Sequence, residues 1–194
     1  SSSYRKVTTD SMENAEGRED INLNDTQRKI ADEFCSDIDN GIRKTYLLHG
    51  VTGSGKTEVY VRCIRKVIEE GRQAIVLIPE IALTYQTVRY FTRYFGDRVT
   101  FVNSKLSSGE KYDQFERAKR GEVDVVIGPR SALFTPFERL GLIVIDEEHE
   151  GSYKSDNPPK YHARDVALER ARMEGASVIL GSATPSIESY SRAM

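Results

Sequence analysis

The sequence predicts an α/β fold with a doubly wound, mainly parallel sheet. Short apolar runs typical of buried strands alternate with stretches of helical period along most of the 194 residues. A glycine-rich turn follows one of these runs and an acidic turn follows another. Because strands separated by helices pair in parallel, this alternation favours one sheet covered by helices on both faces. The expected strands are 45–49, 74–78, 99–102, 123–127, 142–145 and 177–180.

The chain is expected to form one domain preceded by a short polar segment. Residues 1–20 lack periodicity and have few apolar side chains, which predicts a flexible linker or a vector-derived end. Residues 21–194 carry the strand-like runs and are long enough to bury a sizeable core. The first helix is expected to begin at Asp25 or Thr26 and to stop at residues 40–41, Asn-Gly.

Composition narrows the class of protein. Hydrophobic residues make up 38%, the net charge is −2, and no apolar run approaches the length of a membrane span. We therefore expect a cytoplasmic domain that does not contact a membrane, and any contact with nucleic acid must be local. Cys35 and Cys63 are too few for a structural zinc site, and each lies in a helical pattern that favours a buried, reduced thiol.

Residues 50–57, Gly-Val-Thr-Gly-Ser-Gly-Lys-Thr, fit the phosphate-binding P-loop and directly follow the first strand-like run. A strand, a glycine-rich turn and the start of a helix would aim several backbone N–H groups at one anion. This context indicates a P-loop whose natural ligand is a polyphosphate with Mg²⁺, as in a kinase, a GTPase or a motor, and the alternation of strands and helices favours a RecA-like P-loop NTPase lobe. The alternative is a glycine-rich turn that binds nothing. The predicted nucleotide-binding residues in this segment are Gly50, Thr52, Gly53, Ser54, Gly55, Lys56 and Thr57, with Thr57 also a metal ligand.

An acidic turn, residues 146–149 with the sequence Asp-Glu-Glu-His, follows the apolar run 142–145. Open α/β sheets bind ligands at the carboxyl ends of their strands. Asp146 is therefore predicted to hold Mg²⁺, directly or through water, and Glu147 to polarise the attacking water. Lys56, Asp146 and Glu147 are the predicted catalytic residues. Considered alone, such a cluster is more often a solvated turn.

The small hydroxylated residues after the last strand-like run form a third motif. Residues 181–185 read Gly-Ser-Ala-Thr-Pro, so Ser182 and Thr184 can reach toward a γ-phosphate or toward the turn at Asp146. The same residues also suit a strand-to-helix loop in which a hydroxyl caps the helix and Pro185 occupies its first position. The two interpretations are compatible.

Taken together, these motifs resemble the motor core of superfamily 2 helicases, with residues 146–149 similar to the DEEH form of motif II and residues 181–184 similar to motif III. Flanking stretches resemble the PriA family of primosomal replication-restart helicases (primosomal protein N′) over residues 21–194. These stretches are 50–60, 77–84, 130–134 and 161–167.

The resemblance implies the ATP-binding lobe of an ATP-dependent DNA helicase that unwinds stalled replication forks during replication restart and primosome assembly. It implies single-stranded and forked DNA, single-strand-binding protein and primosome proteins as partners. It also implies a second lobe with a zinc-binding insertion, for which 194 residues leave no room. We therefore expect an excised first lobe with little or no turnover alone.

The resemblance further implies that Gln27 reads adenine, because an amide can pair with both N6 and N7. Without the resemblance, a solvent-facing helix glutamine is the simpler interpretation. For DNA, Thr84 and Arg130 follow strand-like runs and are our candidates for phosphate contacts. Alternatively, Thr84 caps a helix and Arg130 pairs with a surface acid.

The stretch 151–164 begins just after His149 and interleaves aromatic and basic residues. Aromatic faces stack on unpaired bases while cations follow the backbone. The resemblance implies that this loop and His149, with Ser182 and Thr184, couple DNA binding to hydrolysis; the alternative is an exposed loop whose tyrosines cover the core edge. The predicted DNA-binding residues here are Tyr153, Lys154, Lys160, Tyr161 and Arg164.

Two other functions are open at the level of sequence. One is a different superfamily 2 translocase, such as a restriction-type motor. The other is a nucleotide-dependent DNA-binding module without turnover.

Overall fold

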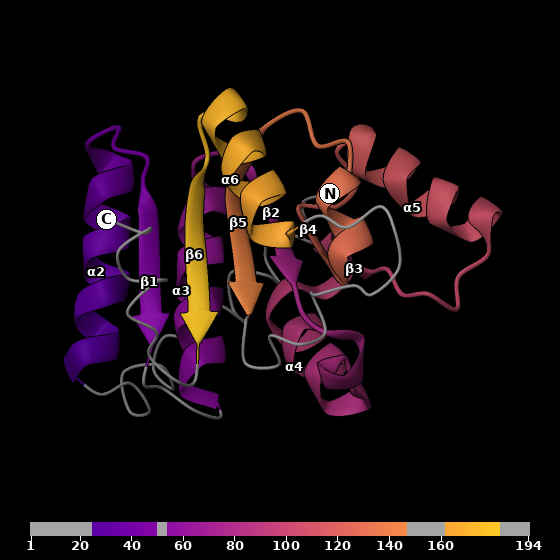
Figure 1. Cartoon of the computed structure of the whole chain (residues 1–194), viewed down its shortest axis with the longest axis horizontal. Helices are drawn as coiled ribbons and strands as arrows, with labels where there is room; N and C mark the ends of the chain where they lie inside the picture. The colour runs from indigo at the N-terminus through magenta and orange to yellow at the C-terminus, as the bar shows by residue number, and fades with distance from the viewer. Residues whose placement is uncertain (1–24, 50–53, 147–161, 183–194) are drawn as a thin grey trace.

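A computed structural model describes residues 25–49, 54–146 and 162–182. Its six strands form one sheet in the order β1-β6-β5-β2-β4-β3, and every neighbouring pair is parallel. Consecutive strands are joined by helical connections (Figure 1). The predicted α/β class and parallel sheet are therefore confirmed.

The element bounds follow the sequence pattern closely. The strands are β1 (Thr45–His49), β2 (Gln73–Leu77), β3 (Val99–Phe101), β4 (Val125–Gly128), β5 (Leu140–Asp146) and β6 (Ser177–Ser182). The longer helices are α2 (Asp25–Asp39), α3 (Ser54–Glu69), α4 (Tyr85–Phe95), α5 (Ser108–Lys119) and α6 (Ala163–Glu174). The short 3-10 helices are η1 (Glu80–Ala82), η2 (Gly96–Arg98) and η3 (Arg130–Phe134).

The predicted bounds of β1 match the observed ones, and the other predicted strand ends lie within two residues of the observed ends. The expected run 123–127 becomes β4 at Val125–Gly128, and the expected run 142–145 extends to β5 at Leu140–Asp146. Pairing with neighbouring strands sets these limits: Asp146 is in register with Gly181, so the ladder continues one residue past the apolar run. The first helix begins at Asp25, as predicted.

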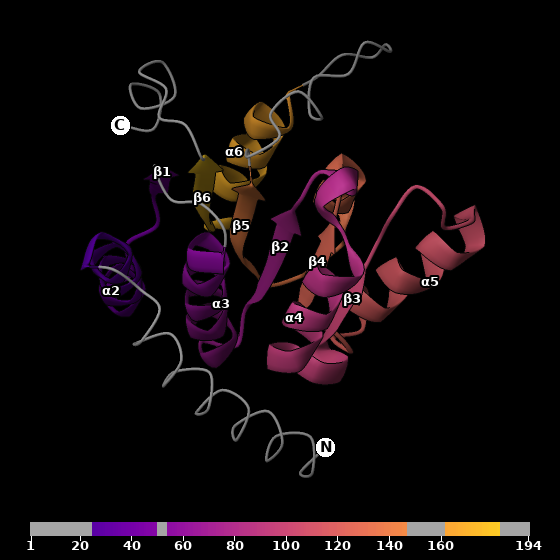
Figure 2. The ribbon, with the colours of Figure 1, turned by 90° about the horizontal axis from the view of Figure 1, so that it is seen from below.

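Helices cover both faces of the sheet. In Figure 2, α2, α3 and α4 lie on one side of the strands and α6 lies on the other. The alternation of side chains along a strand divides the interior into two cores. In β2, Ala74 and Val76 pack on the side of α3, while Ile75 and Leu77 pack on the side of α6.

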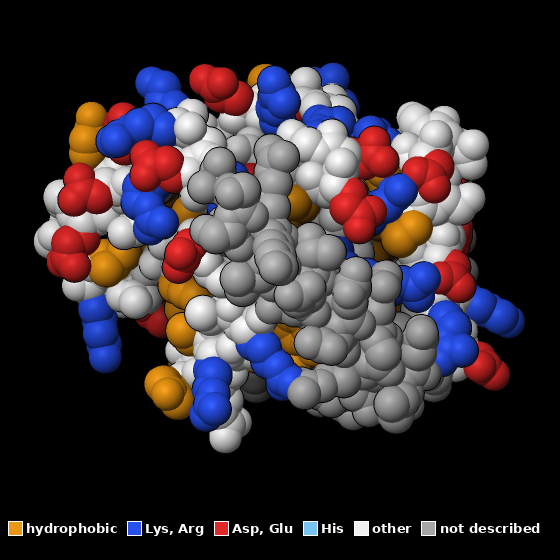
Figure 3. All heavy atoms as spheres, turned by 180° about the vertical axis from the view of Figure 1, so that it is seen from behind, with side chains coloured by type: hydrophobic (Ala, Val, Ile, Leu, Met, Phe, Trp, Pro, Cys, Tyr) orange, Lys and Arg blue, Asp and Glu red, His pale blue; other side chains and the backbone are white. Residues whose placement is uncertain are grey.

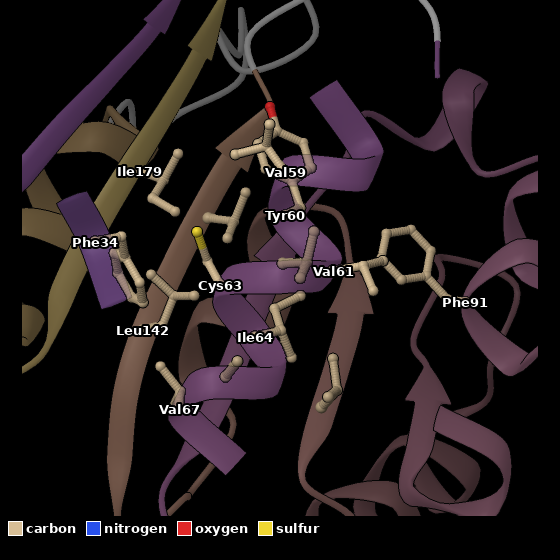
Figure 4. Close-up of a cluster of buried hydrophobic side chains, with 14 of the residues drawn as sticks. Phe34, Val59, Tyr60, Val61, Cys63, Ile64, Val67, Phe91, Leu142 and Ile179 are labelled. Carbon is tan, nitrogen blue, oxygen red and sulfur yellow. The ribbon is translucent and has the colours of Figure 1, made fainter. Parts of the chain in front are cut away.

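The first core is centred on α3. Val59, Cys63 and Val67 of this helix pack with Phe34 of α2 and with Leu142 of β5, all five within 1% of full burial (Figure 4). Burying large apolar side chains stabilises a fold by roughly 1.5–3 kcal/mol each. This packing ties α3, and with it the start of the helix at Ser54, to the centre of the sheet.

The second core contains small residues on α6. Ala163, Ala167 and Ala171 are spaced four apart and are 0–3% exposed, so this face of the helix lies close against the sheet. The helix ends at Gly175, whose φ of 67° is the left-handed conformation that glycine adopts without strain.

The surface is of mixed charge. On the face seen in Figure 3, basic and acidic side chains are interspersed where the residues are described. Within the described ranges, no helix combines the length and the apolar character that crossing a membrane requires.

Candidate nucleotide-binding site

The candidate site lies at the carboxyl ends of three adjacent strands. Since β1, β6 and β5 are neighbours and parallel, they end at the same edge of the sheet. In the ladder, Gly181 is in register with Leu48 on one side and with Asp146 on the other. The ends of the P-loop strand, the acidic-motif strand and the third-motif strand therefore meet at one place.

Helix α3 adds the cationic side chain of the site. It begins at Ser54, so Gly55 and Lys56 occupy its first turn, where the unpaired backbone N–H groups give the helix end a partial positive charge. The Lys56 Nζ atom lies 2.9 Å from Asp146 Oδ1. The Lys56 side chain is 1% exposed and that of Asp146 is 14% exposed.

This ion pair brings together two residues that are 90 positions apart in the sequence. A buried charge is stabilised only when it has partners, so in this state Asp146 compensates the Lys56 ammonium. A phosphate that binds at the start of α3 would offer Lys56 a second anion at the same position. The geometry therefore suits a lysine that exchanges a carboxylate for a phosphate.

Two further predicted ligands lie in described helices. Thr57 follows Lys56 in α3 and is half-buried. Gln27 lies in the first turn of α2 and is 5% exposed, so the interpretation of Gln27 as a solvent-facing glutamine is wrong. Its burial is compatible with adenine recognition, which stays a prediction.

Many predicted site residues lie outside the described residues. For Ser54 and Ser182 only the backbone is described, at the start of α3 and at the end of β6. The predicted linker 1–20 is also outside, as are Gly50, Thr52, Gly53, Glu147, His149, Tyr153, Lys154, Lys160, Tyr161 and Thr184.

The candidate DNA contacts at Thr84 and Arg130 lie at the same edge of the sheet, after β2 and β4. Thr84 is exposed and caps α4, because its side chain accepts a hydrogen bond from the Thr87 N–H at 3.3 Å. The capping interpretation is thus correct as geometry, and it leaves the exposed threonine available for a phosphate. Arg130 is half-buried at the start of η3.

The sequence predicts that Arg164 ends an aromatic and basic loop, and this prediction is wrong. Arg164 lies in the first turn of α6, after the N-cap residue His162. The alanine spacing of α6 already favours a helix from residue 163, and burial of Ala163 fixes its start.

A contact that the sequence did not reveal joins two of the loops at this edge. The Ser104 backbone N–H donates to Glu80 Oε1 at 2.6 Å, which links η1 to the loop after β3. Hydrogen bonds from Ser104 hold the pKa of the Glu80 carboxyl below its ordinary value. The spacing of the two residues gives no signal for this contact, because only the order of β2 and β3 in the sheet brings them together.

The two cysteines are free thiols in different surroundings. Cys63 is fully buried in α3, as predicted. Cys35 is only half-buried, and burial raises the pKa of its thiol above the usual value. Among the described residues, no group of three or more histidine, cysteine, aspartate or glutamate side chains could hold a metal ion.

Residues 24–193 match the family described as DEAD/DEAH box helicase. The chain belongs to this family. The motifs that meet at the carboxyl ends of β1, β5 and β6 are thus those of a helicase motor lobe, as the sequence predicts.

Among characterised relatives, the chain is similar to replication restart protein PriA of Bacillus subtilis (strain 168), with 49% identity over 193 residues. This alignment covers 98% of the chain and 24% of that protein. Replication restart protein PriA of Chlamydia trachomatis serovar D is 54% identical over 170 residues, which are 87% of the chain and 21% of that protein. The chain thus spans about a quarter of the length of these relatives.

A similar fold occurs in a solved structure described as RecG bound to a three-way DNA junction. Its TM-score is 0.63 at 26% sequence identity, over 88% of this chain and 22% of the other. This similarity supports the RecA-like assignment of the sheet.

Proposed function

We propose that this chain is the ATP-binding lobe of an ATP-dependent DNA helicase that unwinds DNA at stalled replication forks. The observation that carries the proposal is the buried pair of Lys56 and Asp146 at 2.9 Å, in a chain of the DEAD/DEAH box helicase family that is similar to replication restart proteins. In this pair, the two charged groups that a triphosphate and its metal require already lie next to each other.

The triphosphate is proposed to bind at the N-terminal end of α3. The P-loop amides and the end of the helix supply N–H donors to the phosphates, and Lys56 supplies the positive charge. Gln27, buried in α2, is proposed to recognise the adenine base. Glycines at residues 50, 53 and 55 let the backbone approach the phosphates closely.

The side chains present are suitable for Mg²⁺, which prefers carboxylate and hydroxyl oxygens. Thr57 and Asp146 would hold the ion, which when bound neutralises charge on the outer phosphates. Glu147 is proposed to orient the attacking water and to accept its proton.

The DNA-facing surface extends along the same edge of the sheet. Thr84 and Arg130 are proposed to contact phosphates, while Tyr153 and Tyr161 stack on unpaired bases, with Lys154, Lys160 and Arg164 as the neighbouring cations. His149, Ser182 and Thr184 would relay the nucleotide state to these contacts.

The proposed partners, the proposed location and the second lobe are taken from the resemblance of this chain to the PriA family. Single-strand-binding protein and primosome proteins are the proposed partners, and the cytoplasm is the proposed location. A second lobe would supply the rest of the motor and a zinc site, so residues 21–194 alone are proposed to bind nucleotide with little or no turnover.

The test is ATP hydrolysis by the full-length protein with a fork, with blunt duplex and without DNA. We expect the fork to stimulate turnover more than duplex does, and Lys56→Ala to weaken ATP binding by more than tenfold through loss of a charge-assisted bond of about 1.5–3 kcal/mol. Lys66→Ala is the matched control, because Lys66 lies in the same helix but pairs with Asp39 at the surface. Equal nucleotide affinity of wild type and Lys56→Ala by calorimetry would refute the site.

Other outcomes identify the alternatives. Equal stimulation by duplex and fork would indicate a different translocase. Nucleotide-dependent DNA binding by the full-length protein without turnover would indicate a binding module.

A further inference from the structure

Tyr60 lies one helical turn after Lys56, on the same face of α3. Residues four apart on a helix point in the same direction, so the two side chains approach neighbouring positions of the sheet. Tyr60 is 1% exposed. In Figure 4 its ring leans from α3 toward the carboxyl end of β5.

The residue opposite Tyr60 is Gly181 of β6. A Cβ atom at Gly181 would lie 1.7 Å from the Tyr60 hydroxyl oxygen and 2.9 Å from Cζ, closer than any side chain can come. Tyr60 therefore occupies the place where a side chain at position 181 would be. This explains why a glycine stands near the carboxyl end of this strand.

The two contacts of this helical turn meet adjacent strands at the same height. Lys56 pairs with Asp146 at the end of β5, and Tyr60 packs on Gly181, which is the register partner of Asp146 in β6. Ser182 follows Gly181 directly. A shift of α3 that moves Lys56 must consequently also move Tyr60 against the strand that ends in Ser182.

We propose that Tyr60 is a positioning residue that holds the end of β6 against the nucleotide-binding helix, so that α3 and the strand end at Gly181 and Ser182 move together. This inference rests on the proposed helicase function, in which Ser182 relays the nucleotide state. Tyr60 itself touches neither nucleotide nor DNA in this role.

The first test asks whether the Tyr60 ring is the reason that position 181 accepts only glycine. Gly181→Ala in the full-length protein is expected to lower the thermal unfolding midpoint. In a Tyr60→Leu background, where the clashing atoms are absent, Gly181→Ala should lower the midpoint much less. Gly141→Ala is the matched control: its Cβ would lie 2.8 Å from Val67 Cγ1, so it crowds α3 from β5 far from Lys56. Gly141→Ala should lower the unfolding midpoint by the same amount whether position 60 holds Tyr or Leu. If Gly181→Ala also lowers the midpoint equally in both backgrounds, Tyr60 does not exclude a side chain at position 181.

The second test asks whether the contact matters for coupling. We expect Tyr60→Phe to change nucleotide affinity and basal turnover less than twofold, while DNA-stimulated turnover falls at least threefold. Gly141→Ala should leave the ratio of stimulated to basal turnover unchanged, although it lowers stability. An unchanged ratio in Tyr60→Phe would overturn the positioning role and leave only packing.

Failure of the Tyr60 proposal and failure of the proposed helicase function would give different results in these tests. A wild-type protein without DNA-stimulated hydrolysis would refute the helicase proposal and, with it, the coupling role of Tyr60. The unfolding midpoints would still decide whether Tyr60 excludes a side chain at position 181.

Discussion

Neutralising Lys56 is expected to cost stability as well as nucleotide binding. In Lys56→Met the aliphatic stem is kept and the ammonium is lost, so Asp146 is left 14% exposed without its partner at 2.9 Å. At that distance and an effective dielectric constant of about 20, the attraction between the two charges is about 6 kcal/mol, much of which offsets their desolvation.

Breaking a buried pair by removing one partner destabilises a protein by about 3–5 kcal/mol. Because Asp146 keeps some contact with solvent, we expect the free energy of unfolding of Lys56→Met to fall by about 3 kcal/mol, the lower end of this range. For a chain of this size, this corresponds to a decrease of about 6–12 °C in the unfolding midpoint. Asp146→Asn removes the carboxylate that faces the more deeply buried Lys56 ammonium, so its loss of stability should be at least as large.

The double variant Lys56→Met/Asp146→Asn removes both charges, so it should be clearly more stable than the sum of the single losses predicts. Urea unfolding of the four proteins, without nucleotide, measures this coupling. Arg172→Gln is the control, because Arg172 pairs with Glu169 at 2.7 Å at the exposed surface and its loss should leave the midpoint unchanged. Additive losses in the double variant would refute the reasoning that the two charges stabilise each other.

Three further predictions concern hydrolysis, coupling and pH. In the full-length protein, Glu147→Gln should keep ATP binding but strongly reduce hydrolysis, since an amide cannot accept the proton of water; near-normal steady-state turnover would remove Glu147 from this role. Tyr153→Ala/Tyr161→Ala should leave basal turnover nearly intact and diminish stimulation by single-stranded DNA, because stacking contributes roughly 1–3 kcal/mol per base; equal losses of both rates together with lower thermal stability would favour a structural role. Asp37 accepts a hydrogen bond from the Tyr46 hydroxyl at 2.6 Å, which holds the pKa of the carboxyl below its ordinary 3.8. A depressed pKa gives stability that is present above pH 3.8 and is lost as the pH falls through the folded-state value. Asp37→Asn should therefore be less stable than wild type at pH 7, by about 1–2 kcal/mol, and the difference should narrow below pH 3.8; a difference that stays constant with pH would contradict this assignment.

Local patterns in the sequence predict the elements of this protein well. The run 142–145 is apolar without alternation, as a strand buried on both faces requires, and it forms the middle of β5. The glycine-rich turn and the lysine at position 56 indicate a phosphate site because each residue type has a local task. Such features depend on neighbours in the chain, so they are readable before folding is known.

The order of strands in the sheet is decided only by the tertiary structure. The sequence places β6 last, yet β6 pairs between β1 and β5, and this insertion brings Gly181 next to Asp146. Strand ends shift for the same reason, since hydrogen bonding to a neighbour extends β5 to Asp146 and ends β4 at Gly128.

The sequence by itself determined the α/β class, the P-loop and the acidic motif, because strand burial and phosphate binding require particular residues at short spacing. Only the folded chain decided that Lys56 pairs with Asp146, that Glu80 binds Ser104, and that Tyr60 leaves no room for a side chain at Gly181. Each of these contacts joins residues on different elements. Their distance depends on how helices pack on the sheet, and packing is a property of the whole chain rather than of any local pattern.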